Sequence, residues 1–409
     1  MKVLHLCGKD FFGAGRAAYR LHKGLLHVGI GSKMWVGAKR TADDTVVDIH
    51  NGKAKKKLTK IYIKLEKLII KSKAKGSREM FSLGYPAHSI RRKIETEKPD
   101  IVHLHWINRG YMNLNELKGI KIPVVITLHD MWWFTGGCHY DEGCGRYVNG
   151  CASCPILSED GEYGLSLKQL SCKREILNNT SPITFIGLST WMQDCVKQSL
   201  IGQDHKIKQI PNGIDVDIFA PMDKQACRNK LNLPNDKKLI LFAAVDVLSE
   251  TRKGYQYLSQ ALTMLKPEEY ELVVIGEQSD ANSISGLKTY FPGEINDDQL
   301  MIEYMSAVDV AVVPSLQENL SNLIMESLAC ATPVVAFKIG GNGDMIKHKV
   351  NGYLAKHKNI EDLTEGIEFC TKSENNILLS ETARQTIVDN FDINEVSKKY
   401  IQLYQSLVE

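Results

Sequence analysis

Two glutamates, Glu318 and Glu326, are the residues of this chain whose types and spacing most favour chemistry. Glu318 follows a short β-branched run and falls in a loop, whereas Glu326 lies inside the apolar helix that the pattern predicts next. A carboxylate among apolar neighbours is costly unless it accepts hydrogen bonds, and the hydroxyl groups of a sugar are suitable donors. The alternative is a surface loop acid and an exposed helical glutamate, neither with a ligand.

A second group with chemical potential is a set of cysteines in the glycine-rich loop 136–155, with the spacing C-x5-C-x6-C-x2-C. A C-x2-C pair with two more thiols nearby is typical of a closed tetrahedral zinc site, which would order a loop lacking its own core. We therefore expect a structural zinc ion in this loop. The loop should lie beside the active-site cleft, so the zinc would shape the access of the acceptor. Disulfides or free thiols are the alternatives. The expected ligands are Cys138, Cys144, Cys151 and Cys154, and His139 could replace one of them.

A glycine loop near the start of the chain could receive an anion. Gly13, Gly15 and Ala18 match the dinucleotide pattern G-x-G-x-x-A, but residues 8–12 separate Gly13 from the preceding strand. The second predicted strand also lacks a following acid to hold a ribose, so a dehydrogenase fits poorly. Small residues at a helix N-terminus still let backbone N–H groups approach an anion closely. The alternative is a tight turn without a ligand.

The segment 53–78 combines many lysines with a single acid, Glu66. Its apolar residues recur at helical spacing: Leu58, Ile61, Tyr62, Leu65, Leu68 and Ile69. A basic amphipathic helix of this kind can lie on an anionic bilayer. The alternative is a solvated helix that packs its apolar stripe on its own domain.

The elements that must position these residues alternate between strand and helix. Short β-branched runs bounded by turn residues predict strands at 2–7, 32–36, 101–106, 124–128 and 184–188, and again at 238–244, 271–275, 289–291, 308–314 and 333–337. Amphipathic stretches such as 14–28 and 87–96 lie between some of them. Connections long enough for helices indicate parallel sheets covered on both faces.

The length of 409 residues suits two domains. We expect a Rossmann-like domain at 1–207, a second at 208–390, and a C-terminal helix at 391–409 that returns to the first domain. The hinge lies at 211–215, where Pro211 and Gly213 interrupt the pattern. Doubly wound sheets bind ligands at the carboxyl ends of their strands, so we expect a cleft between facing sheets.

Composition narrows the class of protein. A content of 43% hydrophobic and 24% charged residues is that of a globular protein, and a net charge of +3 creates no global attraction to nucleic acid. No apolar run approaches the roughly 20 residues that a membrane-spanning helix needs. The apolar start is too short for a signal peptide, so we expect a cytoplasmic protein whose 10 cysteines are reduced, buried or metal-bound.

Together these segments resemble the retaining glycosyltransferases of family 4, which have the GT-B fold. The motif Glu318-x7-Glu326 resembles the E-x7-E motif of that family. Four other segments agree in order and cover nearly the whole chain: the loop around Gly13, the strand end at 127–130, the hinge at 211–215 and Arg252-Lys253-Gly254. Family members place an arginine directly after the first strand of the second domain; here residues 243–246 lack one, and Arg252 is expected to replace it.

The resemblance implies a role for each matching residue. Glu318 is expected to contact the donor sugar and Glu326 the nucleotide ribose, with His129 near the reacting carbon. The other donor contacts implied are Gly13, Gly15, Arg252, Lys253, Asn319 and Leu320. The donor would be a UDP or GDP sugar, with no metal cofactor for catalysis. The acceptor would be a saccharide, such as a lipid-linked one at the inner membrane face, as in capsule or O-antigen biosynthesis.

These roles agree with the chemistry of hexosyl transfer. Cleavage of the sugar–phosphate bond develops an oxocarbenium-like sugar and a diphosphate that gains negative charge. Cations such as Arg252 and Lys253, and a helix N-terminus before Leu323, stabilise that transition state more than the ground state. Two other readings stay open at this point: a nucleotide-sugar epimerase of GT-B fold, and a zinc-containing nucleic-acid-binding protein, although the near-neutral charge argues against the latter.

Overall fold

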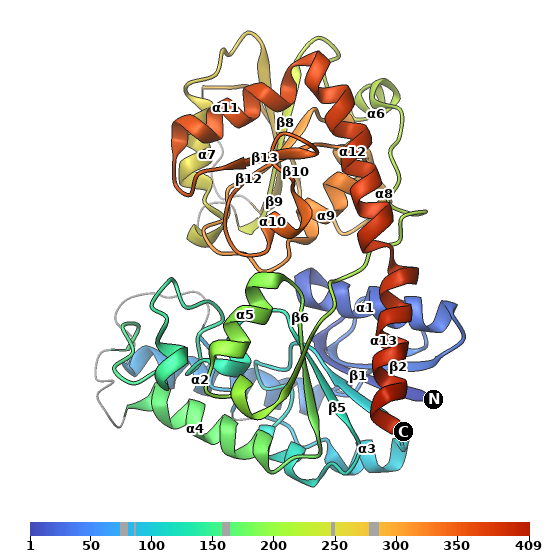
Figure 1. The fold of residues 1–409 in the computed structure, drawn as a ribbon, viewed down its shortest axis with the longest axis vertical. Coiled ribbons are helices and arrows are strands. Elements are labelled where there is room, and N and C mark those ends of the chain that lie inside the picture. Colours follow the sequence, from blue (N-terminus) through green and yellow to red (C-terminus); the bar gives the residue numbers. More distant parts are fainter. Residues whose placement is uncertain (74–80, 86, 158–163, 247–249, 278–285) are drawn as a thin grey trace. The chain divides into compact units, whose positions relative to one another are not determined.

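The chain divides into two compact units in the computed structural model, which describes residues 1–73, 81–85, 87–157, 164–246, 250–277 and 286–409 (Figure 1). Unit 1 comprises Met1–Gly213 and Ile393–Glu409, and unit 2 comprises Ile214–Asp392. The first unit thus extends six residues beyond the expected boundary at 207. Residues 74–78 of the expected basic helix lie outside the described residues.

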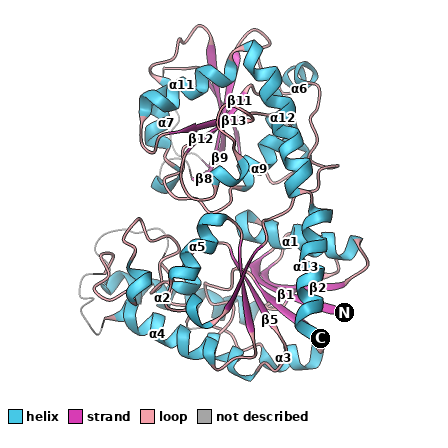
Figure 2. Ribbon diagram, viewed as in Figure 1, coloured by secondary structure: helices cyan, strands magenta, loops and turns pink. Residues whose placement is uncertain are grey.

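Unit 1 contains a parallel sheet of seven strands in the order β3-β2-β1-β4-β5-β6-β7 (Figure 2). Its strands are β1 (Lys2–Lys9), β2 (Gly31–Ala38), β3 (Val46–Asp48), β4 (Ile101–Leu104), β5 (Val124–Leu128), β6 (Ile183–Gly187) and β7 (Lys206–Gln209). Its α-helices are α1 (Phe12–His27), α2 (Lys53–Lys73), α3 (Arg91–Glu97), α4 (Leu165–Asn178), α5 (Thr190–Gln198) and α13 (Ile393–Val408). Short 3-10 turns are η1 (Leu114–Gly119), η2 (Trp132–Phe134), η3 (Arg146–Asn149) and η4 (Gly202–Asp204).

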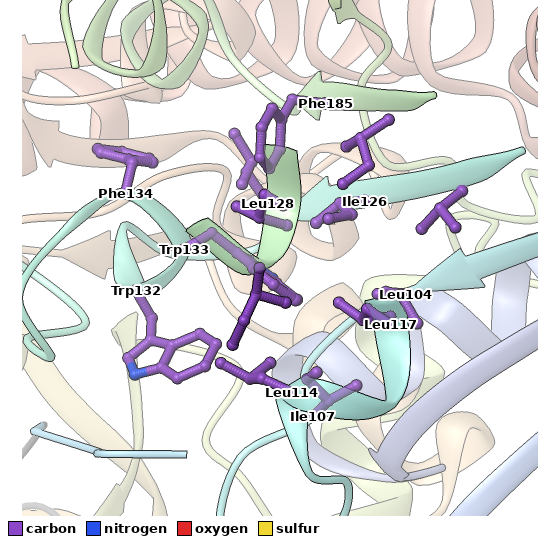
Figure 3. Close-up of a cluster of buried hydrophobic side chains, with 14 of the residues drawn as sticks. Leu104, Ile107, Leu114, Leu117, Ile126, Leu128, Trp132, Trp133, Phe134 and Phe185 are labelled. Atoms are coloured by element: carbon purple, nitrogen blue, oxygen red, sulfur yellow. The ribbon is translucent and has the colours of Figure 1, made fainter. Parts of the chain in front are cut away.

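The core of unit 1 explains why the strands read as continuous apolar runs. Every residue of β5 and of β6 is buried, because helices and loops cover both faces of the sheet. One cluster joins residues of β4, β5 and β6 to η2 (Figure 3), whose Trp132, Trp133 and Phe134 are almost fully buried. The loop that follows β5 is therefore anchored in the core as it leaves the carboxyl edge of the sheet.

The C-terminal helix α13 belongs to unit 1, and Figure 1 shows it beside α1. A side chain at Gly24 of α1 would collide with Ser397 and Ile393, so glycine permits this close approach. Further along α13, the buried hydroxyl of Tyr404 lies 2.7 Å from Nδ1 of His103 in β4. The chain thus returns to the first sheet through α13.

Unit 2 contains a parallel sheet of six strands in the order β10-β9-β8-β11-β12-β13. Its strands are β8 (Lys238–Asp246), β9 (Tyr270–Glu277), β10 (Thr289–Gly293), β11 (Val310–Val313), β12 (Val334–Phe337) and β13 (Gly352–Ala355). Its helices are α6 (Lys224–Lys230), η5 (Thr251–Lys253), α7 (Tyr255–Leu262), α8 (Asp298–Ala307), α9 (Asn322–Ala329), α10 (Asn342–Met345), α11 (Ile360–Thr371) and α12 (Ser373–Phe391).

Every strand expected from the sequence is present, with ends shifted by a few residues. The sequence did not predict β3, β7 and β13. β3 has only three residues, β7 is a polar edge strand whose residues are largely exposed, and β13 begins with glycine and contains no β-branched residue. Each missed strand lies at the edge of its sheet, where burial imposes the weakest pattern.

Candidate active site

Three of the expected site residues of unit 2 come together at the carboxyl edge of its sheet. Arg252 and Lys253 lie in η5, in the connection after β8, and Glu318 lies in the loop after β11. Nζ of Lys253 lies 2.9 Å from Oε2 of Glu318. Nη1 of Arg252 lies 3.3 Å from the same carboxylate oxygen. A backbone hydrogen bond also links the two loops, because Leu316 N donates to Arg252 O at 2.8 Å.

Glycines allow these loops to approach each other so closely. Gly254 has a φ of +72°, and a side chain there would collide with the carbonyl oxygen of Pro314. Gly340, with a φ of +49°, meets the carbonyl oxygen of Glu318 in the same way. A residue with a Cβ at either position would push a loop away from the Glu318 carboxylate. The glycines at 254 and 340 thus contribute to the site by conformation.

The electrostatic setting keeps Glu318 ionised. Its side chain is almost fully buried, and burial alone would raise its pKa, but Lys253 and Arg252 together lower the pKa to about 2. Glu250 also pairs with Arg252, since Oε1 of Glu250 lies 3.1 Å from Nη2 of Arg252. The arrangement supplies a buried carboxylate acceptor next to two cations, which suits a ligand with both hydroxyl and phosphate groups.

Glu326 lies in α9, the helix that follows the loop of Glu318. Ser321 caps α9, its hydroxyl accepting from Ile324 N at 3.5 Å, and so starts the helix directly after Asn319 and Leu320. Glu326 is 3% exposed, and Asn319 and Leu320 are also buried. The alternative of an exposed helical glutamate is therefore wrong. The burial of a carboxylate here fits a position that has hydrogen-bond partners.

The glycine loop of unit 1 lies in the first turn of α1. A side chain at Gly15 would collide with the backbone of Lys9 and Asp10, so glycine is required for the tight passage from β1 into the helix. At Gly13, by contrast, an added Cβ would meet no atom within 4 Å, and the residue is exposed. The helix N-terminus beside Gly13 is thus accessible to a ligand group.

His129 follows β5 and is the outer end of a chain of histidines. Its Nε2 lies 3.0 Å from Nδ1 of His105, and Nε2 of His105 lies 3.0 Å from Nδ1 of His5. Burial lowers the pKa of His129 to about 4, although Asp130 acts in the opposite direction. At neutral pH these rings are uncharged, so each hydrogen bond needs one ring as donor and the next as acceptor, which fixes ring orientation.

This chain of histidines was not expected from the sequence. His5, His103 and His105 have ring nitrogens within 4.8 Å of one another, a spacing that a metal ion could also use. The nitrogens of His103 already lie 2.7 Å from Tyr404 Oη and from Thr127 Oγ1, so hydrogen bonds account for that ring. A signal was present in the sequence, since His103 and His105 alternate with apolar residues in a predicted strand and must share one face.

The cysteine loop is ordered by contacts other than a closed thiol cluster. Within the described residues, no three of its sulfurs lie within 4.8 Å of one another, and all four cysteines are free thiols. Cys138 and Cys154 pack with Phe81, whereas Cys151 accepts from Gly136 N at 3.2 Å. The zinc site therefore stays a prediction.

His139, considered as a substitute zinc ligand, has other partners. Its Nδ1 donates to Asp130 Oδ2 at 2.6 Å, and its Nε2 lies 2.9 Å from Ser82 Oγ. Asp130 also accepts from the indole of Trp106 at 3.0 Å. Both ring nitrogens of His139 have partners that join the cysteine loop to the end of β5, and its use as a substitute zinc ligand stays a prediction.

The basic helix α2 turns most of its apolar stripe away from unit 1. Leu58, Ile61, Leu65, Leu68 and Ile69 are between 37% and 55% exposed. Glu66 helps to hold the helix, since it accepts from Leu83 N at 2.7 Å and from Gly84 N at 3.2 Å. Tyr62 of the stripe packs against His88, with 5.2 Å between the ring centres, so the alternative that the stripe packs on its own domain holds for Tyr62 but not for the five exposed residues. In the described part of the chain, no helix is both long and apolar enough to cross a bilayer.

With this geometry in place, comparison with known sequences decides the family. The sequence profile of Glycosyltransferase Family 4 matches residues 13–218, and that of Glycosyl transferases group 1 matches residues 223–387. The chain belongs to glycosyltransferase family 4. The two matches cover most of both units, and they do not favour the epimerase and nucleic-acid-binding alternatives.

Curated relatives agree with this family. An uncharacterized glycosyltransferase of Methanocaldococcus jannaschii is 25% identical over 76% of this chain and 83% of its own length. A D-inositol 3-phosphate glycosyltransferase of Xylanimonas cellulosilytica is 35% identical over 62% of this chain and 59% of its own. A UDP-Gal:alpha-D-GlcNAc-diphosphoundecaprenol alpha-1,3-galactosyltransferase of Escherichia coli is 23% identical over 52% and 57%.

Solved structures establish the fold of this family 4 glycosyltransferase. A sucrose-phosphate synthase of Thermosynechococcus elongatus aligns with a TM-score of 0.71 at 18% identity, over 100% of this chain and 99% of its own. Anabaena HepE, solved with UDP-glucose, aligns with a TM-score of 0.66 at 17% identity, over 100% of both chains. The two parallel α/β sheets and these neighbours identify the predicted GT-B fold.

Proposed function

We propose that this family 4 enzyme is a retaining hexosyltransferase that uses a nucleoside diphosphate sugar of the UDP or GDP type. The observation that carries the proposal is the pairing of Lys253 and Arg252 with Glu318. In a donor, the sugar hydroxyls and the phosphate oxygens lie on either side of one bond, within a few ångströms. A carboxylate and two cations in direct contact can therefore bind both sides of the bond that breaks.

Each residue then has a defined task. Glu318 accepts from the sugar hydroxyls, and Lys253 with Arg252 neutralises the charge that grows on the departing diphosphate. Glu326, with Asn319 and Leu320 before it, binds the nucleoside. In unit 1, His129 contacts the sugar near its reacting carbon, and the α1 N-terminus at Gly13 and Gly15 faces the phosphate-bearing ligand. None of these tasks uses a metal cofactor.

For the acceptor, we propose a saccharide carried by a lipid at the inner face of the cell membrane. The outward apolar stripe of α2 and its lysines support this, because they suit an anionic bilayer. The Escherichia coli relative is named for a UDP-galactose donor and a diphosphoundecaprenol-linked acceptor, which agrees with both parts of the proposal. The product would enter a surface polysaccharide such as a capsule or an O-antigen.

Donor hydrolysis in the absence of acceptor tests the proposal. We expect slow release of nucleoside diphosphate from one UDP or GDP sugar in a panel of nucleotide sugars, and a loss of that release in Lys253→Met. Once the acceptor is known, NMR of the product reports whether the anomeric configuration is retained. Inversion at the anomeric carbon would contradict the retaining assignment, and no release from any donor in the panel would contradict the donor class.

A further inference from the structure

Four basic side chains gather in unit 1 where the end of β3 meets the first turns of α2 and α3. They are His50, Lys55, His88 and Lys93. The ammonium groups of Lys55 and Lys93 approach a single acceptor, the carbonyl oxygen of Ile49, at 3.3 and 3.2 Å. Two like charges that converge on one oxygen repel each other, and one carbonyl offsets only part of that repulsion.

His50 lies beneath these lysines and is 2% exposed. Among the described residues neither of its buried ring nitrogens makes a hydrogen bond of good geometry, although the backbone of Tyr111 lies close enough to act on the ring. Its ring lies 4.0 Å from that of His88, centre to centre, and His88 Nε2 is 2.8 Å from Thr59 Oγ1 of α2. Burying a polar ring without a hydrogen-bond partner costs free energy, and a ligand that binds beside the ring can supply the missing partner.

No acid balances this cluster within the described residues. The carboxylate of the neighbouring Asp48 pairs with Lys56 at 3.5 Å, and it accepts from the backbone N–H of His50 but not from its ring. Burial, and then His88, Lys93 and Lys55, lower the pKa of His50 to about 3, although the backbone of Tyr111 acts in the opposite direction. Burial and the same lysines also lower the pKa of His88, and burial and Lys55 lower that of Lys93.

We propose that His50, Lys55, His88 and Lys93 form a binding site for a phosphate group, and that the group belongs to a lipid. A phosphate offers several acceptor oxygens and a negative charge, so it can receive both ammonium groups and a proton on the His50 ring. The choice of a lipid rests on the proposed membrane contact, because Lys55 lies on the same helix as the outward apolar stripe. The site is distinct from the donor contacts of unit 2.

The site recognises phosphate, whatever molecule carries it. Lysine binds phosphate as a point charge, and two lysines within reach of one oxygen can hold two oxygens of one tetrahedral group. Neighbouring lysines of α2, such as Lys57 and Lys60, act on a bilayer through general charge. Local binding at His50 therefore separates the site from diffuse attraction.

The experiment follows the histidine ring resonances of His50 and His88 by NMR in the full chain while inorganic pyrophosphate is added. We expect saturable shifts of both rings and a rise in the pKa of His50. Lys55→Met with Lys93→Met should abolish these shifts. Lys57→Met with Arg92→Met is the matched control, since it removes one charge from each of the same helices, and it should retain them. Equal shifts in both variants, or none in the native chain, would overturn the site.

Vesicles then separate a lipid phosphate from a free one. Phosphatidylcholine vesicles containing phosphatidic acid, a phosphomonoester, are compared with phosphatidylcholine vesicles of equal surface charge that contain oleate, so the two differ in the monoester and share the zwitterionic diester. We expect at least fivefold tighter binding to phosphatidic acid, lost in the Lys55/Lys93 variant and kept in the control. Pyrophosphate shifts without this preference would overturn the lipid source. Donor hydrolysis is measured separately, so failure of the proposed enzymatic function is recognised independently.

Discussion

Glu318 and Glu326 have different surroundings, and the difference separates their tasks. Glu318 is paired with Lys253 and Arg252, the groups proposed to hold the diphosphate. Glu326 is buried within α9 and is 3% exposed. A carboxylate beside the cations can act where charge develops, whereas a carboxylate set back in a helix is suited to binding a neutral ribose.

Single alanine substitutions should therefore give unequal results. Glu326→Ala is expected to weaken binding of the free nucleoside diphosphate, because the ribose loses an acceptor. Glu318→Ala should not weaken that binding, since it frees Lys253 and Arg252 for the diphosphate, and it should lower kcat with the intact donor, since Glu318 acts on the sugar that moves. A charged hydrogen bond in a closed site is worth roughly 1.5–3 kcal/mol, so each effect should be about ten- to a hundredfold.

Calorimetric titration with nucleoside diphosphate, paired with steady-state kinetics, measures both effects. Thermal unfolding of each variant provides the control, since neither residue is proposed to hold up the core. Equal loss of diphosphate binding in the two variants would contradict the division of tasks. Full activity in both would contradict their placement in the site.

The histidine chain makes a second prediction at this scale. Asparagine at position 105 keeps a polar atom at the place of Nδ1, which contacts His129, whereas glutamine keeps one at the place of Nε2, which contacts His5. If His105 orients His129, His105→Gln should lower kcat about five- to tenfold more than His105→Asn, since about 1 kcal/mol is lost with one hydrogen bond. Similar melting temperatures with different kcat values are expected. Equal kcat values would show that the contact serves stability only.

At the scale of elements, the cysteine loop is expected to bind one zinc ion. Four thiols lie in one loop, and Lys173, fully buried, donates to the carbonyl oxygens of Trp132 and Thr135 at 2.5 and 3.0 Å. Burial lowers the pKa of Lys173 to about 7, while the nearby thiols of Cys138 and Cys151 act in the opposite direction. A zinc–thiolate centre would carry negative charge and so stabilise this lysine in its charged form.

Metal analysis of protein purified without added metal should find about one zinc per chain. Cys151→Ser with Cys154→Ser should release it and loosen the loop, while Cys172→Ser, an exposed cysteine outside the loop, should keep it. Limited proteolysis reports the loosening. Wild-type protein without metal and with full stability would exclude the zinc site.

Helix α2 is the second element with a prediction. Binding to vesicles is expected to require anionic lipid and to weaken as salt is added. Replacing Ile61 and Leu65 by Gln should weaken it, because both are 45% exposed on the stripe. Each lysine replaced should cost about 1 kcal/mol, or about fivefold in affinity. Co-sedimentation with vesicles measures the affinity of each variant.

A matched control exists in unit 2, where Ile377 and Leu378 of α12 are 64% and 67% exposed. Replacing that pair by Gln removes more exposed apolar surface than the α2 pair, and from a helix without the lysine-rich pattern. It should leave vesicle binding unchanged. Binding that falls equally in both double variants, or that survives the loss of several α2 lysines, argues against α2 as the contact.

At the scale of the whole molecule, the two units should differ in their response to acid. Burial lowers the pKa of His5, His103 and His105 far below the ordinary value near 6.5, and that of His22 and His129 to about 4. All of them belong to unit 1. Between those lowered values and 6.5, the unfolded chain binds more protons than the folded one, so stability rises with pH and falls as pH drops below 6.5.

Tryptophan fluorescence can follow this selectively, since all 5 tryptophans fall in unit 1. The urea midpoint seen by tryptophan is expected to decrease from pH 7 to pH 4.5, with each pKa unit of difference worth about 1.4 kcal/mol per group. The part of the circular dichroism transition that belongs to unit 2 should change less. A tryptophan midpoint that stays constant over this range would show that the histidines are not buried as described.

Much of this protein could be derived from its sequence. Strands buried on both faces are continuous apolar runs rich in β-branched residues, so the alternation of strand and helix could be predicted. The order of the family motifs could also be recognised. The position of Glu318 directly after a parallel strand is enough to place it at the carboxyl edge of a sheet. These inferences succeed because they depend on residues close together in the chain.

Only the tertiary structure decided which distant residues meet. Lys253 and Glu318 are 65 positions apart, and the contact depends on β8 and β11 being neighbours in the sheet. The histidine chain needs β1, β4 and β5 side by side, and the direction of the α2 stripe depends on Glu66 docking to a distant backbone. Periodicity shows that a helix has an apolar face; what that face meets depends on the packing of the whole domain.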